Sequence, residues 1–297
     1  MSPTAPEQGD EQPASVPAEQ RPVSTPAEQR TIFAMGGGGF TMEPTNPLLD
    51  DFVLSLAPAS EPRILFLPTA SGDTTTQINA FYARFGGREC VPEHLSLFRL
   101  GDLEGSLEEL VHEQDIVYVG GGSMRNLLAL WRAHGLDDLL SGAWRRGTVL
   151  AGISAGAMCW FEGGITCSSG TPEPFAGLGL LMGSLTVHAD GEPERLPVWL
   201  SSVRAGTLPA GWAADDGVGL LFRGQRLERV VSSRPGAAAQ RVDALAGELV
   251  RHRLEPELLG TEEPSSRPAV DDDVRELRRV HQLRREMTGE THRFTDA

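Results

Sequence analysis

The sequence contains no lysine. All 26 of its basic residues are arginines, and they stand against 41 acidic residues, which gives a formal net charge of −15. Without lysine the chain cannot supply a P-loop lysine, a Schiff-base lysine or a serine–lysine dyad. The acidic balance also removes the basic face that nucleic acids and anionic membranes require. We therefore expect neither a nucleic acid nor a membrane as a partner.

Cysteine is scarce as well. Cys90, Cys159 and Cys167 form an odd set without a C-x-x-C pair, so neither a disulfide framework nor a zinc site is expected, and a reducing cytoplasm fits best. No apolar run is long enough to cross a bilayer, and the first 30 residues lack the basic start and apolar core of a signal peptide. H-E-x-x-H, spaced metal ligands and a phosphate loop are also missing, which predicts no metal and no cofactor.

Composition divides the chain into three parts. Residues 1–30 are rich in Pro, Glu, Gln, Ser and Ala and repeat PAEQR, which is typical of a disordered tail. Residues 261–297 are polar and contain one stretch with the charge pattern of a helix. We expect a single compact catalytic domain between them, over residues 31–260.

Within that domain, short apolar strands alternate with amphipathic helices. This alternation predicts an α/β fold with a mostly parallel sheet that is covered by helices on both faces. Residues 217–233 predict an antiparallel hairpin at a sheet edge. The expected strands begin at 31, 63, 115 and 148, and the expected helices span 74–86, 125–135 and 136–147.

The motif GISAG at residues 152–156 is a G-x-S-x-G set between an apolar strand and an expected helix. Small residues two positions before and after Ser154 allow a sharp turn that exposes the serine above the sheet, as in a nucleophile elbow. Because the motif stands where this geometry requires it, we predict Ser154 as a catalytic nucleophile.

A serine nucleophile needs a base, which is usually histidine. His188 ends an apolar stretch and opens a loop rich in acids, so it is the expected base. The other six histidines lie in polar segments, among arginines or in the C-terminal tail; these are His94, His112, His134, His252, His281 and His292.

The sequence alone does not decide which acidic residue orients the base. Asp190 follows His188 by two positions, so both side chains would point to one face of a strand. Glu162, on the helix expected after the serine, and Glu173, in the next loop, are alternatives. The pair at residues 215–216 is expected to be only a turn.

An oxyanion hole needs backbone donors beside the nucleophile. The amide of Ala155 is one candidate by position, and Gly121 or Gly122 at the end of another strand is the second. The glycine run at residues 36–39 ends the first strand at the same edge, where open α/β sheets bind ligands. Gly38 is the expected substrate contact there, with a purely steric turn as the alternative.

Arg195 is the only arginine between Arg146 and Arg204. Its guanidinium could hold an acidic group of a substrate, or it could simply pair with Glu192 and Glu194.

Four segments of the sequence resemble the peptidase E family, which includes aspartyl dipeptidases and, more distantly, cyanophycinases. They are VGGGSMRNLL (119–128), AGISAGAMCWFE (151–162), GLGLLMGSLTVHADGEPER (177–195) and ADDGVGLLF (214–222). The resemblance implies a flavodoxin-like three-layer sandwich, related to class I glutamine amidotransferases but with serine in place of their cysteine. It also implies a small peptide with an N-terminal aspartate as substrate, and the roles given above to Ser154, His188 and the oxyanion-hole glycines. A homodimer is compatible with it.

Two positions depart from the family pattern. Ser123 stands where relatives commonly have Asn, and Cys167 stands in a segment where they usually have Asp. If that Asp is the family's third triad member, this chain lacks it there. Asp190 is then the favoured substitute, because related amidotransferases orient their histidine with an H-x-acid pattern, and a weak or inactive enzyme becomes a competing interpretation.

Two other functions compete. GGGGF at residues 36–40 is similar to the oxyanion loop of some lipases, which would make the chain an α/β-hydrolase carboxylesterase. That fold needs a late histidine, here His252 or one in the tail. The third alternative is a binding protein that keeps the fold without catalysis.

Overall fold

A computed structural model describes residues 24–245 and 248–260 of the chain. They belong to one compact unit that ends at Gly260. Most of the expected N-terminal tail and the whole expected C-terminal tail lie outside the described residues. No described helix is both long and apolar enough to cross a lipid bilayer.

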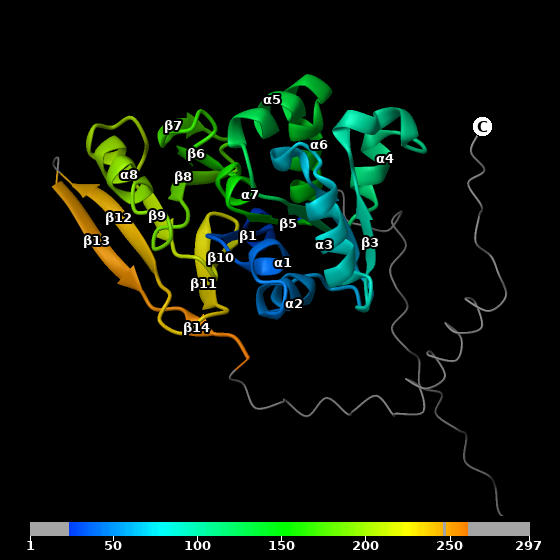
Figure 1. The fold of residues 1–297 in the computed structure, drawn as a ribbon, viewed down its shortest axis with the longest axis horizontal. Coiled ribbons are helices and arrows are strands. Elements are labelled where there is room, and N and C mark those ends of the chain that lie inside the picture. The colour runs from blue at the N-terminus through cyan, green and yellow to red at the C-terminus, as the bar shows by residue number, and fades with distance from the viewer. Residues whose placement is uncertain (1–23, 246–247, 261–297) are drawn as a thin grey trace, which may run out of the picture. The chain divides into compact units, whose positions relative to one another are not determined.

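An eight-stranded sheet forms the centre of the domain (Figure 1). Its five consecutive neighbours β1, β5, β4, β2 and β3 are parallel, whereas β10 pairs antiparallel with both β1 and β11. In spatial order the strands are β14 (Glu257–Leu258), β11 (Arg226–Ser232), β10 (Val218–Arg223), β1 (Thr31–Met35), β5 (Val149–Ile153), β4 (Ile116–Val119), β2 (Arg63–Leu67) and β3 (Val91–His94).

The pleat of β1 shows how the layers form. Successive side chains of a strand point to opposite faces. Ile32 and Ala34 accordingly belong to one buried cluster, and Phe33 and Met35 belong to another. Both faces must therefore be apolar, which explains the continuous hydrophobic runs of these strands.

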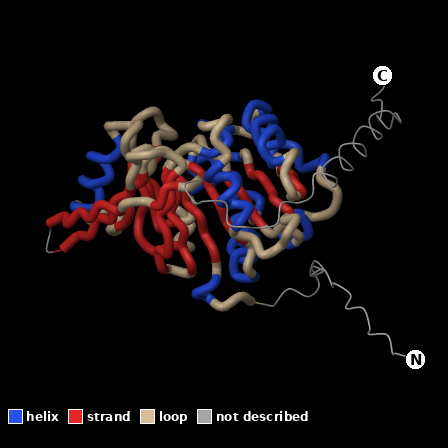
Figure 2. The backbone as a smooth tube through the Cα atoms, turned by 90° about the horizontal axis from the view of Figure 1, so that it is seen from below, coloured by secondary structure: helices blue, strands red, loops and turns tan. Residues whose placement is uncertain are grey.

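Helices cover both faces of this sheet (Figures 1 and 2). Those that pack on the Phe33 face are α1 (Gly39–Met42), α2 (Leu48–Ser55) and α3 (Thr75–Phe85). Those that pack on the Ile32 face are α4 (Leu107–His112), α5 (Met124–His134) and α6 (Leu136–Arg146). Short 3₁₀ turns lie at η2 (Ala27–Gln29), η3 (Thr69–Ser71) and η4 (Leu97–Asp102).

A second, six-stranded sheet packs beside the first and was not predicted. Its strands in spatial order are β13 (Glu248–Leu254), β12 (Ala239–Leu245), β9 (Gly211–Ala214), β8 (Leu181–Thr186), β6 (Phe161–Thr166) and β7 (Glu173–Ala176). Helix α8 (Arg195–Arg204) buries Trp199 and Val203 in a separate apolar cluster with residues of this sheet. Phe161 and Leu185 join the cluster on the Ile32 face of the first sheet, so the two sheets share a core.

The predicted fold class is confirmed, including the mostly parallel sheet, the helices on both faces and the antiparallel hairpin of β10 and β11. The segment after the serine is different. Helix α7 (Ala155–Met158) has only four residues, and the chain then enters β6. The two glycines at 163 and 164 disfavour a helix, and the strand is instead stabilised by pairing with β7 and β8.

Residues 24–30, expected to belong to a disordered tail, contact the domain. The amide of Thr25 donates to the carbonyl of Arg145 at 2.8 Å, and the amide of Gly224 donates to the carbonyl of Arg30 at 2.7 Å. The Arg30 guanidinium lies 5.5 Å above the centre of the Trp144 ring. The boundary predicted at residue 30 is therefore too late.

Candidate active site

Ser154 lies at a sharp turn between the end of β5 and the start of α7. Its φ of 56° and ψ of −115° are strained for a residue with a side chain. The turn is held by the Ser154 amide, which donates to the carbonyl of Met35 at 3.0 Å, and by the Ser154 carbonyl, which accepts from the Ala157 and Met158 amides. The serine is therefore presented at the carboxyl edge of the sheet.

The glycines of the motif are required by close packing. A Cβ atom on Gly152 would overlap the carbonyl oxygen of Gly156, and one on Gly156 would overlap the carbonyl oxygen of Val119. Any larger residue at either position would push α7 away from β4 and β5. The spacing G-x-S-x-G therefore follows from the sharpness of this turn.

His188 contacts the serine hydroxyl. Its Nε2 is 2.8 Å from Ser154 Oγ, across 34 positions of the sequence. The residue follows β8 by two positions, has a φ of 53°, and is fixed by its amide, which donates to the carbonyl of Gly36 at 3.3 Å. Only 8% of His188 is exposed, so burial restricts the ring to this orientation.

The other ring nitrogen of His188 faces Asp216. Nδ1 and Asp216 Oδ1 are 2.5 Å apart. Since a carboxylate only accepts hydrogen bonds, this contact requires the proton on Nδ1 and leaves Nε2 to accept from Ser154. A Cβ atom on Gly37 would overlap Asp216 Oδ1, so a glycine is needed there for the pair to form.

Asp190, the predicted orienting residue, does not contact His188. Its Oδ1 instead accepts a hydrogen bond from the backbone amide of Asp216 at 2.8 Å. The positive φ of His188 breaks the strand geometry on which the prediction depended, so the two side chains do not share a face. Asp190 therefore stabilises the turn that carries Asp216. The prediction that Asp190 binds the imidazole is wrong.

The two alternative acids lie elsewhere. Glu162 is exposed on β6, where it accepts from the amide of Gly183 at 2.5 Å and so joins β6 to β8. Glu173 accepts from Arg125 at 2.8 Å and from Ser169 at 2.8 Å. Neither carboxylate reaches His188. The acid that does contact His188 is Asp216, which was expected to form only a turn, although two acids directly after β9 were visible in the sequence.

Three backbone amides are available for an oxyanion. The amides of Ala155, Gly121 and Gly122 have no acceptor among the described residues. A Cβ atom on Gly121 would lie 3.3 Å from Ser154 Cβ, which places this glycine directly beside Ser154. The arrangement suits an oxygen that develops negative charge next to Ser154.

Arg195 is buried, with 6% of its surface exposed. Its Nε donates to Glu192 Oε2 at 2.7 Å and its Nη1 donates to the carbonyl of Ile165 at 2.6 Å. Two of its donors are therefore used within the protein, which opposes its predicted role as a free cation for a substrate carboxylate.

The three remaining predicted positions are Gly38, Ser123 and His252. Gly38 has a φ of 95° and packs near Leu49 and Gly217, as a tight turn requires. Ser123 begins α5 by accepting from the Asn126 amide at 3.2 Å, and its hydroxyl donates to Ser168 at 2.9 Å. His252 is exposed on β13. The imidazole at the serine is thus His188, as the peptidase E resemblance implies.

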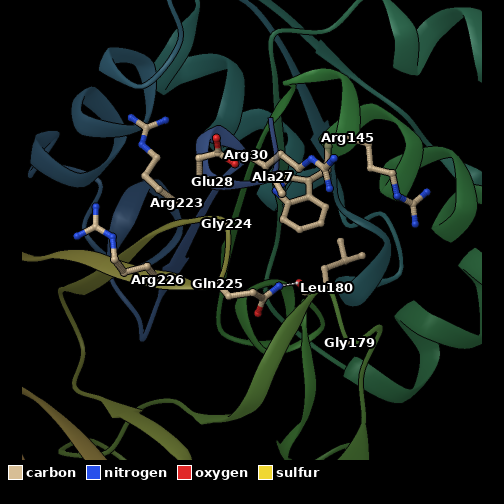
Figure 3. A pocket seen from close by; sticks show the side chains of 11 residues that line it. Ala27, Glu28, Arg30, Arg145, Gly179, Leu180, Arg223, Gly224, Gln225 and Arg226 are labelled. Carbon is tan, nitrogen blue, oxygen red and sulfur yellow. Dashed lines mark hydrogen bonds between the residues drawn. The ribbon is translucent and has the colours of Figure 1, made fainter. Parts of the chain in front are cut away.

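A cavity of about 780 Å³ opens elsewhere on the domain (Figure 3). Ser154, His188 and Asp216 are not among the residues that line it. Figure 3 shows the guanidinium of Arg145 pointing away from those of Arg223 and Arg226, so these cations do not converge on one point. Among residues 24–245 and 248–260, no cluster of three His, Cys, Asp or Glu side chains is placed to hold a metal ion.

The chain is similar to known peptidases. Residues 32–230 match the model of peptidase family S51. The uncharacterized peptidase YgaJ of Bacillus subtilis (strain 168) is 48% identical over 229 residues, which cover 77% of this chain and 99% of that protein. The imidazole glycerol phosphate synthase subunit HisH of Geobacillus thermodenitrificans is 34% identical over 99 residues, which cover 32% of this chain and 44% of that protein.

The fold also matches a solved structure. A peptidase from an acI-B1 Actinobacterium superposes with a TM-score of 0.57 at 21% identity, over 76% of this chain and 94% of that one. The predicted resemblance to the peptidase E family is confirmed by these relationships. Because the family match spans more than half of the sequence, and a relative at 48% identity is covered over nearly its whole length, the chain belongs to peptidase family S51.

Proposed function

We propose that this peptidase is a serine peptidase with Ser154 as nucleophile, His188 as general base and Asp216 as the orienting acid. The observation that carries the proposal is the continuous chain of contacts from Ser154 Oγ to His188 Nε2, at 2.8 Å, and from His188 Nδ1 to Asp216 Oδ1, at 2.5 Å. The first contact has the geometry that transfer of the serine proton requires, and the second orients the imidazole.

The proposed reaction proceeds through an acyl-enzyme. Ser154 Oγ attacks the carbonyl carbon of the scissile bond while its proton passes to His188 Nε2. The amides of Ala155 and Gly121 donate to the oxygen of the tetrahedral intermediate. His188 then returns the proton to the departing amine, and the C–N bond breaks. Water next attacks the carbonyl carbon of the acyl-enzyme while its proton passes to His188. The ester bond to Ser154 Oγ breaks as His188 gives that proton to Oγ, which releases the carboxylic acid.

For the substrate we propose short peptides, with N-terminal aspartate as the favoured first residue. The preference rests on the resemblance to aspartyl dipeptidases. The protein carries a net charge of −15 and repels acidic ligands at long range, so a local cation must bind the acidic side chain of the substrate. Because the chain contains no lysine, that cation must be an arginine or a histidine. Arg125 is the proposed candidate in place of Arg195, because its side chain is 48% exposed at the start of α5, three positions after Gly122, and its ion pair with Glu173 uses only Nη2.

Two measurements test the function. A fluorophosphonate probe should label Ser154 in the parent protein and leave Ser154→Ala unlabelled. Hydrolysis of Asp-X, Glu-X, β-Asp-X and neutral dipeptides should then rank the substrates. Labelling without hydrolysis of any peptide would favour an esterase, and the absence of both would favour a binding protein.

The cysteines support a proposed reducing location. Cys90 and Cys159 are buried, Cys167 is partly exposed, and all three are unpaired thiols. We propose the cytoplasm on this ground.

A further inference from the structure

Glu192 holds a carboxylate beside the proposed nucleophile and base. Its Oε1 is 4.0 Å from His188 Nε2, the same nitrogen that lies 2.8 Å from Ser154 Oγ. The side chain is 46% exposed, so a ligand at Ser154 can reach it. At 4.0 Å the carboxylate is too far to accept a hydrogen bond from the imidazole.

The position of this carboxylate is fixed from two sides. Glu192 Oε2 accepts from Arg195 Nε at 2.7 Å, and Arg195 is itself buried and bound to the carbonyl of Ile165. The backbone amide of Glu192 donates to the carbonyl of His188 at 2.8 Å, which sets the distance between the two residues along the chain. Such double support is typical of a group that must be held at one place.

One carboxylate oxygen is left without a donor. Both hydrogen-bonded contacts, with Arg195 and with the thiol of Cys167 at 3.9 Å, involve Oε2. Oε1 accepts no hydrogen bond from any residue in the described part of the chain. Arg195 therefore orients Glu192 without satisfying the oxygen that faces the reaction centre.

We propose that Glu192 Oε1 binds the α-ammonium group of the first residue of the substrate, and that Arg195 is the positioning residue for it. The inference rests on the proposed peptidase function. In any peptide the α-nitrogen lies about 2.5 Å from the carbonyl carbon of the same residue, and that carbon must approach Ser154 Oγ to within about 3 Å. An ammonium group in this position lies near the carboxylate.

The consequence is a peptidase that removes one residue from a free N-terminus. An acetylated α-nitrogen carries no charge and would leave Glu192 unpaired. An internal peptide bond would bring further chain against the carboxylate and Arg195. The contact between Glu192 and the α-ammonium group does not involve the side chain of the first residue. The requirement for a free amine is therefore independent of any preference for aspartate.

The test compares the peptides Asp-Leu and Ala-Leu with their α-N-acetyl derivatives. Binding is measured by calorimetry on Ser154→Ala, which cannot cleave them, and on the same protein with Glu192→Gln added. We expect Ser154→Ala to bind the free-amine peptides about 100-fold more tightly than the acetylated ones. Glu192→Gln should remove most of this ratio, while its amide oxygen still accepts from Arg195.

Glu257→Gln is the matched control, because Glu257 is also a 46% exposed carboxylate paired with an arginine at 2.7 Å but does not contact His188. It should leave the ratio unchanged. A ratio that persists in Glu192→Gln, or that never exists in Ser154→Ala, would overturn the inference. Loss of the proposed function is seen separately, as a lack of hydrolysis by the parent protein, and the binding measurement still decides the role of Glu192.

Discussion

Asp216 lies against His188 although the two residues come from different connections of the sheets. His188 follows β8, whereas Asp216 stands in the turn from β9 to β10, 28 positions later. The turn is held in place because the Gly217 amide donates to the carbonyl of Gly37 at 3.1 Å. Pairing of β10 with β1 brings this turn to the edge where β5 presents Ser154.

Ser154→Ala should abolish hydrolysis and leave the fold intact. Loss of a covalent nucleophile typically lowers kcat by a factor on the order of 10⁶. The measurement is turnover of the best dipeptide, with thermal unfolding as the control for structure. Turnover above roughly one hundredth of the parent rate would exclude Ser154 as the nucleophile.

Asp216→Asn and Asp190→Asn should differ strongly in kcat. Replacing the acid that orients the imidazole lowers kcat by about 10⁴-fold, because the wrong tautomer of His188 is then favoured. Asparagine at position 190 keeps an oxygen that accepts from the Asp216 amide, so its effect should stay within about tenfold. Equal losses in the two variants would contradict the assignment of Asp216.

Asp50 should make stability depend on pH. It is fully buried, lies 3.0 Å from Arg84 and accepts from Tyr118 at 3.2 Å, and burial raises its pKa from 3.8 to about 6. The folded state therefore binds more protons than the unfolded state between these values. The contribution of Asp50 to the free energy of unfolding should fall as pH rises from about 4 to about 6, by on the order of 3 kcal/mol.

Asp50→Asn cannot titrate and so isolates this effect. Urea unfolding of both proteins between pH 4 and pH 8 gives the difference in free energy of unfolding, parent minus variant. That difference should be larger at pH 4 than at pH 8. A constant difference would show that the carboxyl does not change its protonation on folding in this range.

Removal of residues 1–30 should destabilise the domain, whereas removal of residues 1–23 keeps every contact described above. The longer deletion loses two backbone hydrogen bonds, to the Arg145 carbonyl and from the Gly224 amide, and the Arg30–Trp144 contact. We expect it to lower Tm by roughly 5 to 10 °C. Calorimetric scans of the two truncated proteins give the comparison, and equal Tm values would show that residues 24–30 add nothing.

Local sequence was sufficient to predict the sharp turn at Ser154. The turn at Ser154 depends on residues 152–156 and on an apolar strand before them, and all of this information lies within one short segment. The strand–helix alternation was equally local, and it predicted the parallel sheet and the hairpin of β10 and β11. Periodicity is a property of neighbouring residues, so it can be read without the fold.

Tertiary structure alone decided which acid contacts His188, how the second sheet forms and what Arg195 binds. Sequence proximity favoured Asp190, but strand pairing between distant segments brings Asp216 to His188 and leaves Asp190 to hold the turn. The pairing of β6 with β8 and of β8 with β9 is likewise non-local, and no pattern within one segment predicts it. Arg195 was predicted to bind substrate because the sequence shows its charge but not its burial. In the folded protein it is buried, and its guanidinium binds Glu192.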